Sequence, residues 1–291
     1  MASLHLVEPG GLDGVGVGDP VSLDGAEGRH AVSVARVRVG ETLRIADGRG
    51  TVVTGAVVAT GKDSLTLTVS DVSVDAAPRP ALVLVQALAK GGRDEMAVQA
   101  ATEIGVDRIV PWSAARSVSR WDGAKVEKGR ARWAAIAQEA AKQAVRSRVP
   151  SVDAPVTTTQ LAGLVGSSSG GAASSGAVPS SGAARSSGAV PSSGAVPSSG
   201  AVPSSDVGRE ARRAVVVLDP VGAVRLSAWE PPADVDEIVL VVGPEGGIDG
   251  SEFDRLEAAG AVRVRLGDTV LRTSTAGPAA LAVLQTRLGR W

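Results

Sequence analysis

A turn with the sequence GPEGG at positions 243–247 combines residue types that could bind a cofactor. It follows the apolar run 237–242, which reads as a buried strand, and precedes an expected helix whose start is marked by the capping-box spacing of Asp249 and Glu252. Parallel α/β sheets bind ligands at such turns. Glycines let a ligand approach the backbone, whereas Glu245 would repel a phosphate, so the turn suits a cofactor offering hydroxyl groups or positive charge. The alternative is a tight connection that binds nothing.

A second loop with candidate functional residues lies at 266–276 and reads LGDTVLRTSTA. It follows an apolar run and leads into a C-terminal helix whose first turn tolerates Pro278. Ser274 or Thr275 is the expected N-cap of that helix, because a side-chain oxygen there can accept a hydrogen bond from a free backbone N–H. Arg272 has no comparable structural explanation, and we predict a functional role for it.

A basic segment is the third candidate site. Between residues 116 and 148, nine Arg and Lys residues stand against three Asp and Glu, a local excess of six positive charges in a chain of formal net charge −1. Within it, Arg132, Glu139, Gln143 and Arg146 recur at spacings of seven, four and three, which predicts one shared helix face. The charge favours RNA binding by this segment, and the alternative is a solvated face.

Other motifs point away from nucleotide and metal enzymes. Gly14, Gly16 and Gly18 have the spacing of a dinucleotide turn, but no strand precedes them and a proline follows. Segment 55–62 resembles a phosphate loop, but five residues separate its glycines and Asp63 replaces the hydroxyl that would hold magnesium. A nicotinamide-dependent enzyme and a phosphate-loop NTPase are therefore disfavoured. The chain has no cysteine and two histidines, so no protein-bound metal is expected.

The elements that must position these residues fall into two parts. Up to about residue 75 the chain has short alternating runs at 42–46, 51–58 and 64–69, which predict a small β-barrel with a hairpin turn at Asp47-Gly48. Segment 76–80 reads as a linker. From residue 81 onward, expected strands at 82–87, 108–112, 214–218, 237–242 and 262–266 alternate with expected helices at 93–104, 123–147, 250–259 and 275–288. This alternation predicts an α/β domain with a largely parallel sheet.

An insert interrupts the α/β domain. Residues 174–203 repeat the unit SSGAVP five times, with one copy reading SSGAAR. Ser, Gly, Ala and Pro offer too little apolar surface to offset the entropy of ordering, which predicts a disordered low-complexity loop over about 166–208.

Length and composition set the general class. The 291 residues exceed the usual size of a single core, and the 44% apolar fraction is typical of soluble globular proteins. The sequence has no apolar run of about 20 residues and begins without a basic region followed by an apolar stretch. We therefore expect a cytoplasmic protein with no membrane contact.

Five stretches together resemble a known family. They are GRHAVSVARVRVGE (28–41), LAKGGRDEMAVQAATEIGVDRIVPW (88–112), the RW…QEA…Q helix through Pro150 (132–150), VVGPEGGI (241–248) and LGDTVLRTSTA (266–276). The chain is similar in these stretches, and over nearly its whole length, to the RsmE family of ribosomal RNA uridine N3-methyltransferases in the SPOUT superfamily. The pairing of VGPEGG with LGxxxLRTxTA is specific to such enzymes.

The resemblance implies an architecture and a set of partners. Residues 1–77 would form a PUA-like, RNA-binding β-barrel, and residues 78–291 a SPOUT methyltransferase domain whose parallel sheet contains a trefoil knot. The implied cofactor is S-adenosylmethionine, the implied substrate is 16S rRNA of the small ribosomal subunit, and the implied assembly is a homodimer with no metal. The implied cofactor-binding residues are Leu218, Asp219, Gly243, Glu245, Gly246, Gly247, Leu266, Gly267, Val270 and Leu271. The RNA-binding candidates are Arg29, His30, Arg36, Arg116, Arg132, Gln143 and Arg146.

The implied reaction moves the sulfonium methyl group to N3 of a uridine. Arg272 and Ser274 are the catalytic candidates, with Arg272 as the donor that stabilises negative charge on the uracil oxygens. Ser274 stands where many relatives have glutamate, and Ala100 stands where a lysine is expected. Two alternatives remain open: a SPOUT enzyme that methylates the ribose 2′-oxygen, or an RNA-binding ribosome-assembly protein without catalytic activity.

Overall fold

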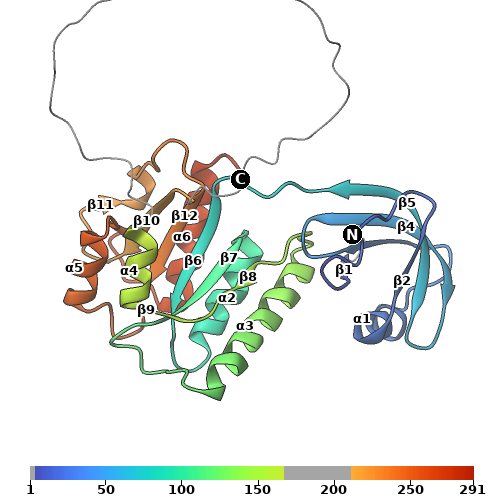
Figure 1. Cartoon of the computed structure of the whole chain (residues 1–291), viewed down its shortest axis with the longest axis horizontal. Helices are drawn as coiled ribbons and strands as arrows, with labels where there is room; N and C mark the ends of the chain where they lie inside the picture. Colours follow the sequence, from blue (N-terminus) through green and yellow to red (C-terminus); the bar gives the residue numbers. More distant parts are fainter. Residues whose placement is uncertain (1–3, 167–210) are drawn as a thin grey trace, which may run out of the picture.

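The computed structural model describes residues 4–166 and 211–291, which form two sheets with helices packed mainly on the second (Figure 1). The greater part of the predicted low-complexity insert, 167–208, lies outside the described residues. No helix in the described ranges is long and apolar enough to cross a membrane.

The first sheet has five strands in the order β1-β3-β4-β5-β2. Its elements are β1 (Leu4–Leu6), β2 (Pro20–Leu23), α1 (Gly25–Arg29), a π-helix (His30–Val34), β3 (Thr42–Ala46), β4 (Thr51–Thr60) and β5 (Leu65–Val74). The predicted hairpin at Asp47-Gly48 is confirmed, with Gly48 at φ +70° between the antiparallel strands β3 and β4. Segment 55–62, which resembled a phosphate loop, lies in β4 and the turn after it. Alternate residues of β2 and of the first half of β5 are buried, and apolar residues of β2, β3, β4 and β5 form a separate core.

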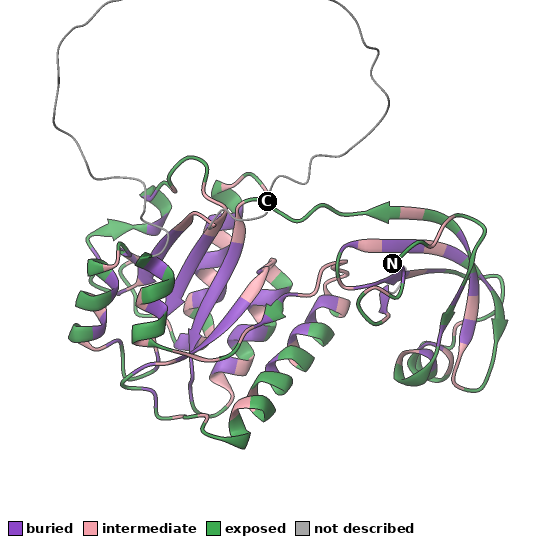
Figure 2. Cartoon of the chain, in the orientation of Figure 1, coloured by how far each residue is buried: buried purple, intermediate pink, exposed green. Residues whose placement is uncertain are grey.

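The second sheet is parallel and has the order β11-β13-β10-β12-β6-β7-β8, with β9 pairing with β7. Its strands are β6 (Ala81–Ala87), β7 (Arg108–Ser113), β8 (Ser151–Val152), β9 (Val156–Thr157), β10 (Arg213–Leu218), β11 (Val224–Arg225), β12 (Glu237–Val242) and β13 (Val262–Arg265). The central strands are buried along almost their whole length (Figure 2). Such burial on both faces explains why these strands read as continuous apolar runs. The predicted division into a small β part and a parallel α/β sheet is confirmed, and the first part is a five-stranded sheet whose edge strands β1 and β2 do not pair within the described ranges.

Helices cover both faces of this sheet. One face carries α2 (Arg93–Ile104), α3 (Ala124–Gln143) and α6 (Thr273–Arg287), which pack on Leu82 and Leu84 of β6. The other face carries α4 (Thr158–Gly166) and α5 (Gly250–Ala258), which pack on Val83 and Val85. A short 3-10 helix (Leu226–Ala228) follows β11. The alternation of partners along β6 is the period of two expected of a strand.

The end of α3 joins the two sheets. The ammonium of Lys142 forms an ion pair with Glu27 of α1, and the hydroxyl of Ser147 is 2.5 Å from Asp75 Oδ2 beyond β5. Arg148 Nη2 donates to the carbonyl of Asp75 at 2.9 Å. These contacts of Lys142 and of the segment just after α3 fix the position of the first sheet relative to α3.

The predicted helix 123–147 is too long. It ends at Gln143, because Ala144 is its C-cap and Val145 adopts φ +55°, a left-handed conformation that no α-helix continues through. Arg146 therefore does not share a helix face with Arg132, and the predicted four-residue face is wrong.

Candidate active site

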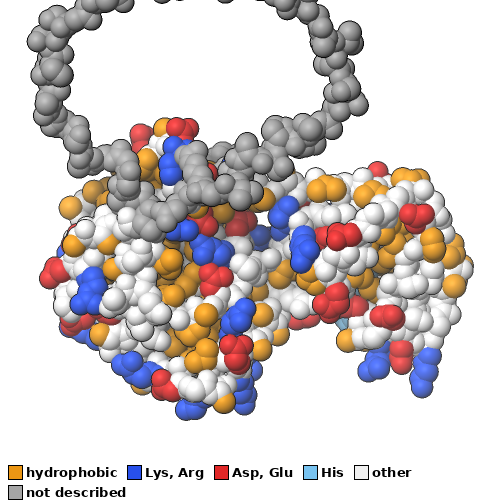
Figure 3. Space-filling view, viewed as in Figure 1, with side chains coloured by type: hydrophobic (Ala, Val, Ile, Leu, Met, Phe, Trp, Pro, Cys, Tyr) orange, Lys and Arg blue, Asp and Glu red, His pale blue; other side chains and the backbone are white. Residues whose placement is uncertain are grey.

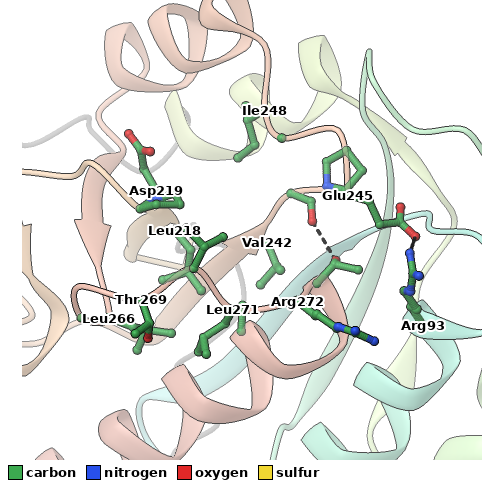
Figure 4. Close-up of a pocket in the computed structure, with 18 of the residues that line it drawn as sticks. Arg93, Leu218, Asp219, Val242, Glu245, Ile248, Leu266, Thr269, Leu271 and Arg272 are labelled. Atoms are coloured by element: carbon green, nitrogen blue, oxygen red, sulfur yellow. Dashed lines mark hydrogen bonds and ion pairs between the residues drawn. The ribbon is translucent and has the colours of Figure 1, made fainter.

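A pocket of about 530 Å³ lies at the carboxyl ends of three neighbouring strands, β13, β10 and β12. Because parallel strands end at the same edge of a sheet, the loops that follow them meet there. The lining residues are Arg93, Leu218, Asp219, Pro220, Val242, Gly243, Pro244, Glu245, Gly247, Ile248, Phe253, Leu266, Gly267, Thr269, Val270, Leu271, Arg272, Thr273 and Ala276. Figure 4 shows the apolar side chains of Leu218, Val242 and Leu271 gathered at its centre.

The pocket brings the predicted cofactor-binding residues together, with the exception of Gly246. Gly246 instead packs on the neighbouring loop, where a Cβ would lie 3.2 Å from both Cβ and the carbonyl oxygen of Arg116. A side chain at this position would crowd the Arg116 loop rather than the pocket. The binding role of the other predicted residues stays a prediction.

The loop before α6 offers unused backbone groups to the pocket. Within the part of the chain that the structure describes, no backbone–backbone hydrogen bond involves residues 267–271. Four of these five residues line the pocket, and only Asp268 does not. Backbone N–H and C=O groups are strong hydrogen-bonding groups that seek partners, so this wall is suited to bind a polar ligand edge.

Asp219 reaches the pocket without offering it a free carboxylate. Its side chain is 6% exposed and accepts hydrogen bonds from Arg263, with 2.9 Å from Arg263 Nε to Asp219 Oδ2. In Figure 4 this carboxylate points away from Leu218 and Leu271. A ligand would therefore meet the backbone of Asp219, and the carboxylate holds β10 to β13.

Glu245 is held at the opposite wall by a residue that the motif analysis did not single out. Arg93 Nη1 donates to Glu245 Oε1 at 2.9 Å (Figure 4). The backbone N–H of Lys90 donates to the same oxygen at 3.2 Å. Partial burial acts to raise the pKa of Glu245, but its own backbone N–H, Arg93 and Lys90 outweigh burial and lower the pKa. The carboxylate is therefore ionised at neutral pH and is a poor base.

Arg272 stands at the rim with an exposed side chain and no hydrogen-bond or ion-pair partner among the described residues. It occupies the N-cap position of α6, with φ −66° and ψ +152°, so the predicted N-cap at Ser274 or Thr275 is wrong. The adjacent hydroxyl of Thr273 donates instead to the carbonyl of Gly243 at 2.7 Å, and no side chain caps the helix. In Figure 4 Arg272 extends toward α2, which carries Arg93.

Ser274, the second catalytic candidate, lies in the first turn of α6 and is not among the pocket-lining residues. The helix starts at Thr273, two residues earlier than the expected 275, and the hydroxyl of Thr273, not that of Ser274, bonds to Gly243. A direct role for Ser274 in chemistry stays a prediction that this geometry does not support.

The RNA-binding candidates are dispersed over three regions. Arg29, His30 and Arg36 are exposed at the α1 end of the first sheet, Arg116 pairs with Asp249 beside the pocket turn, and Arg132 pairs with Glu95 on α2. Gln143 is exposed at the end of α3. Figure 3 shows Lys and Arg side chains at the lower ends of both parts of the molecule, on either side of a hollow.

Arg146 does not belong to this exposed set. Its Nη1 donates to the carbonyl of Thr102 at 2.7 Å, its side chain is 16% exposed, and its Nη2 lies 3.9 Å from Asp107 Oδ1. Burial lowers the pKa of this guanidinium. Arg146 therefore closes the end of α2, and an RNA contact through it is not supported.

The sequence reasoning missed several lining residues, chiefly Arg93, Ile248, Phe253 and Thr269. Arg93 lies in the stretch LAKGGRDE that carried the family resemblance, which was the signal available for it. Phe253 carried no signal, because an aromatic residue on an amphipathic helix reads as core.

Comparison with known proteins agrees with this architecture. A model described as "RNA methyltransferase domain" matches residues 77–168 and 200–285, and one described as "RNA methyltransferase PUA domain" matches residues 23–70. The chain is 36% identical over 269 residues to "Ribosomal RNA small subunit methyltransferase E" of Mycobacterium tuberculosis, covering 92% of this chain and 87% of that protein. The protein of the same name from Bacillus subtilis is 28% identical over 273 residues, covering 92% and 91%.

Solved structures show the same fold. A ribosomal RNA small subunit methyltransferase E from Neisseria gonorrhoeae, described as bound to S-adenosyl methionine, is 23% identical and superposes with a TM-score of 0.73, covering 99% of this chain and 98% of that chain. A methyltransferase from Legionella pneumophila, also described with its bound cofactor, gives a TM-score of 0.72 at 23% identity, covering 99% and 98%.

The expected fold class was a small PUA-like β-barrel before a parallel α/β domain of the SPOUT type, and these matches confirm it with a PUA-like half-barrel in the first part. The threading of the chain through a knot stays a prediction. The coverage and identity to the mycobacterial protein show that the chain belongs to the family of ribosomal RNA small subunit methyltransferases E.

Proposed function

We propose that this protein transfers the methyl group of S-adenosylmethionine to N3 of a uridine in 16S rRNA of the small ribosomal subunit. The observation that carries the proposal is the pocket that has Arg272 at its rim, without an ion-pair partner among the described residues, beside a wall of backbone groups at 267–271 that make no backbone–backbone hydrogen bond. The names of the mycobacterial and Bacillus relatives supply the substrate class.

The residues present fit S-adenosylmethionine. The side chains of Leu218, Leu266 and Leu271 offer an apolar surface for a flat adenine ring, and the backbone groups of 267–271 can pair with its polar edge. Gly243, Gly247 and Gly267 leave room near the backbone. Val270, the backbone of Asp219 and the Glu245 carboxylate complete the proposed cofactor-binding set, to which Gly246 contributes through the shape of its turn.

Bound S-adenosylmethionine supplies an electrophilic methyl group on a positively charged sulfur. The role of the chain is to bind the uracil ring in line with that methyl group and to stabilise the negative charge that spreads over the uracil oxygens once N3 has given its proton to solvent. The transfer would leave the neutral thioether S-adenosylhomocysteine. Arg272 is the proposed donor, because it stands at the pocket rim and no carboxylate among the described residues pairs with its guanidinium. Glu245 does not serve as the base, since Arg93 and backbone amides keep its pKa low.

RNA binding is proposed for a set of exposed polar and basic residues on both parts of the molecule. Arg29, His30 and Arg36 lie on the PUA-like part, proposed as a domain of residues 1–77, and Arg116, Arg132 and Gln143 lie on the domain of residues 78–291. A homodimer would place a second copy of this surface on one RNA. Because the proposed substrate is a ribosomal subunit, we propose a cytoplasmic location.

The test is a methyl-transfer assay with unmethylated small ribosomal subunits and labelled S-adenosylmethionine, alongside a calorimetric titration of the cofactor alone. We expect saturable cofactor binding and label incorporated into 16S rRNA. Label on a ribose 2′-oxygen would replace N3 as the target, and cofactor binding without transfer would favour the assembly-protein alternative.

A further inference from the structure

Gln86 is a fully buried amide in the middle of an apolar sheet. It is the penultimate residue of β6, with 0% of its surface exposed, and its partners in register are Val242 on β12 and Pro111 on β7. Burying an amide costs free energy unless its polar atoms are hydrogen-bonded. The partners of Gln86 therefore indicate what this residue does.

The amide begins a chain of hydrogen bonds across three segments. Gln86 Nε2 is 2.9 Å from Thr273 Oγ1 and 3.2 Å from the carbonyl of Ala87. Thr273 Oγ1 is in turn 2.7 Å from the carbonyl oxygen of Gly243. Thr273 is itself buried, at 6% exposure, in the first turn of α6.

Only one direction of this chain satisfies its atoms. The carbonyl of Gly243 can only accept, so the single hydroxyl proton of Thr273 points to Gly243. The Thr273 oxygen must then accept from the NH₂ group of Gln86, and a flipped amide would place two acceptors against each other. The NH₂ group of Gln86 therefore donates to the Thr273 oxygen while the Thr273 hydroxyl donates to Gly243, and Thr273 is held from both sides.

We infer that Gln86 is a positioning residue for the cofactor pocket, acting through Thr273 to hold the loop before α6 at a set distance from the glycine-rich turn after β12. Gly243 begins one wall of the pocket, and Thr273 follows Arg272 at the end of the other. Gln86 itself does not line the pocket. A shift of about 1 Å between such walls can lower the rate of the catalysed reaction about 100-fold. The inference rests on the proposed function, since it names the cofactor that the pocket binds.

The same amide contributes little to stability. Within the described ranges, Gln86 Oε1 is buried and accepts no hydrogen bond. A buried acceptor without a partner costs free energy, and an apolar side chain of the same length would remove that cost. If Gln86 only filled space in the core, an apolar side chain would be more stable there than an amide with an unpaired oxygen. The NH₂ group of the amide is needed for its hydrogen bond to Thr273.

Gln285 is a matched control in the same helix as Thr273. It is also a buried glutamine, at 5% exposure, with a buried Oε1 that accepts no hydrogen bond from the described residues. Its Nε2 donates to the carbonyl of Ile104 at 2.9 Å, at the far end of α6 from the pocket. Gln285→Met therefore removes the same chemical group without touching the two loops.

The experiment compares Gln86→Met, Thr273→Val, their double variant and Gln285→Met. Calorimetry should show a Kd for S-adenosylmethionine about five- to tenfold higher in both pocket-side single variants, the change expected for one lost hydrogen bond. The double variant should lose no more than Thr273→Val alone, because both changes break one chain. Gln285→Met should keep the wild-type Kd.

Hydrogen exchange of the ligand-free proteins gives a second readout. Gln86→Met should speed exchange in segments 243–248 and 272–276, with the exchange of 81–85 and the melting temperature near wild type. A wild-type Kd and wild-type exchange in Gln86→Met, or single effects that add in full, would overturn the inference. A wild-type protein that binds no S-adenosylmethionine would defeat the proposed function instead.

Discussion

The guanidinium of Arg93 and the carboxylate of Glu245 form an ion pair, 2.9 Å from Nη1 to Oε1, across 152 positions of the sequence. The pair joins the first residue of α2 to the turn after β12. Since Glu245 also accepts from the N–H of Lys90, the loop before α2 and the pocket turn are held together at one carboxylate oxygen.

Arg93→Ala should loosen this turn and weaken cofactor binding. Partly exposed ion pairs contribute about 0.2–1 kcal/mol, so we expect the Kd for S-adenosylmethionine to rise by about two- to fivefold, with a change in unfolding free energy below about 0.5 kcal/mol. Calorimetry and urea unfolding measure the two quantities. The control is Arg287→Ala, which breaks the pair with Glu230 outside the pocket. Equal Kd values for the two variants would mean that Arg93 does not hold the turn.

Glu252 should matter more for stability than its partner in the capping box, Asp249. Asp249 accepts from Ser251 N–H at 3.1 Å, and removing an N-cap costs about 1 kcal/mol. Glu252 is 5% exposed and Glu252 Oε1 also accepts from Ala115 N–H at 2.9 Å and from the Thr158 hydroxyl. We expect Glu252→Ala to cost about 2–3 kcal/mol in urea unfolding. Equal losses in the two alanine variants would contradict the wider role of Glu252.

Arg36 and Arg146 should separate RNA binding from folding. Arg36 is exposed and has no ion-pair partner among the described residues. Arg36→Ala should therefore reduce RNA affinity without a loss of stability, and the negative slope of log K against log salt should become shallower by about 1. Arg146→Ala leaves the carbonyl of Thr102 without its donor and should cost about 2–3 kcal/mol of stability. Filter binding at several salt concentrations and thermal unfolding distinguish them. A salt slope unchanged by Arg36→Ala would remove this residue from the RNA surface.

Stability should fall as the pH is lowered through the range in which histidine titrates. Burial lowers the pKa of His5 from 6.5, against the opposing effect of Glu27. Between the two pKa values the unfolded chain binds the proton and the folded protein does not, so the free energy of unfolding falls with pH by at most about 1.4 kcal/mol per unit. His5→Gln, which cannot titrate, should flatten the profile below pH 6.5. An identical profile in both proteins would assign the loss to other groups.

The sequence predicted elements whose signal is local. The strand Glu237–Val242 and the helix Arg93–Ile104 have the predicted bounds, because a strand buried on both faces and a helix ending at Gly105 are marked by residues within each segment. The capping box of Asp249 and Glu252 is confirmed for the same reason.

Features that depend on distant segments could not be read in this way. The N-cap of α6 is Arg272 rather than Ser274 or Thr275, and the next residue, Thr273, is hydrogen-bonded to Gly243, thirty positions away. The end of α3 is followed by Val145 in a left-handed conformation, which no local motif predicted. The hydrogen-bond partners of Glu245 and Gln86 could not be predicted either, because they lie in distant segments of the sequence. The general place of the pocket was predictable, because its two main loops, 243–247 and 266–276, have glycine, threonine and serine residues between an apolar run and a helix.

The measurement closest to the central claim is the identity of the methylated nucleoside made by wild type and by Arg272→Ala. Unmethylated small subunits are incubated with labelled S-adenosylmethionine, and the digested RNA is analysed by mass spectrometry. We expect N3-methyluridine from wild type, and from Arg272→Ala a rate lower by a factor of about 100 to 1,000 with a nearly unchanged cofactor Kd, as for loss of one charge-stabilising donor. Ribose-methylated product, or an Arg272→Ala enzyme with the wild-type rate, would contradict the account.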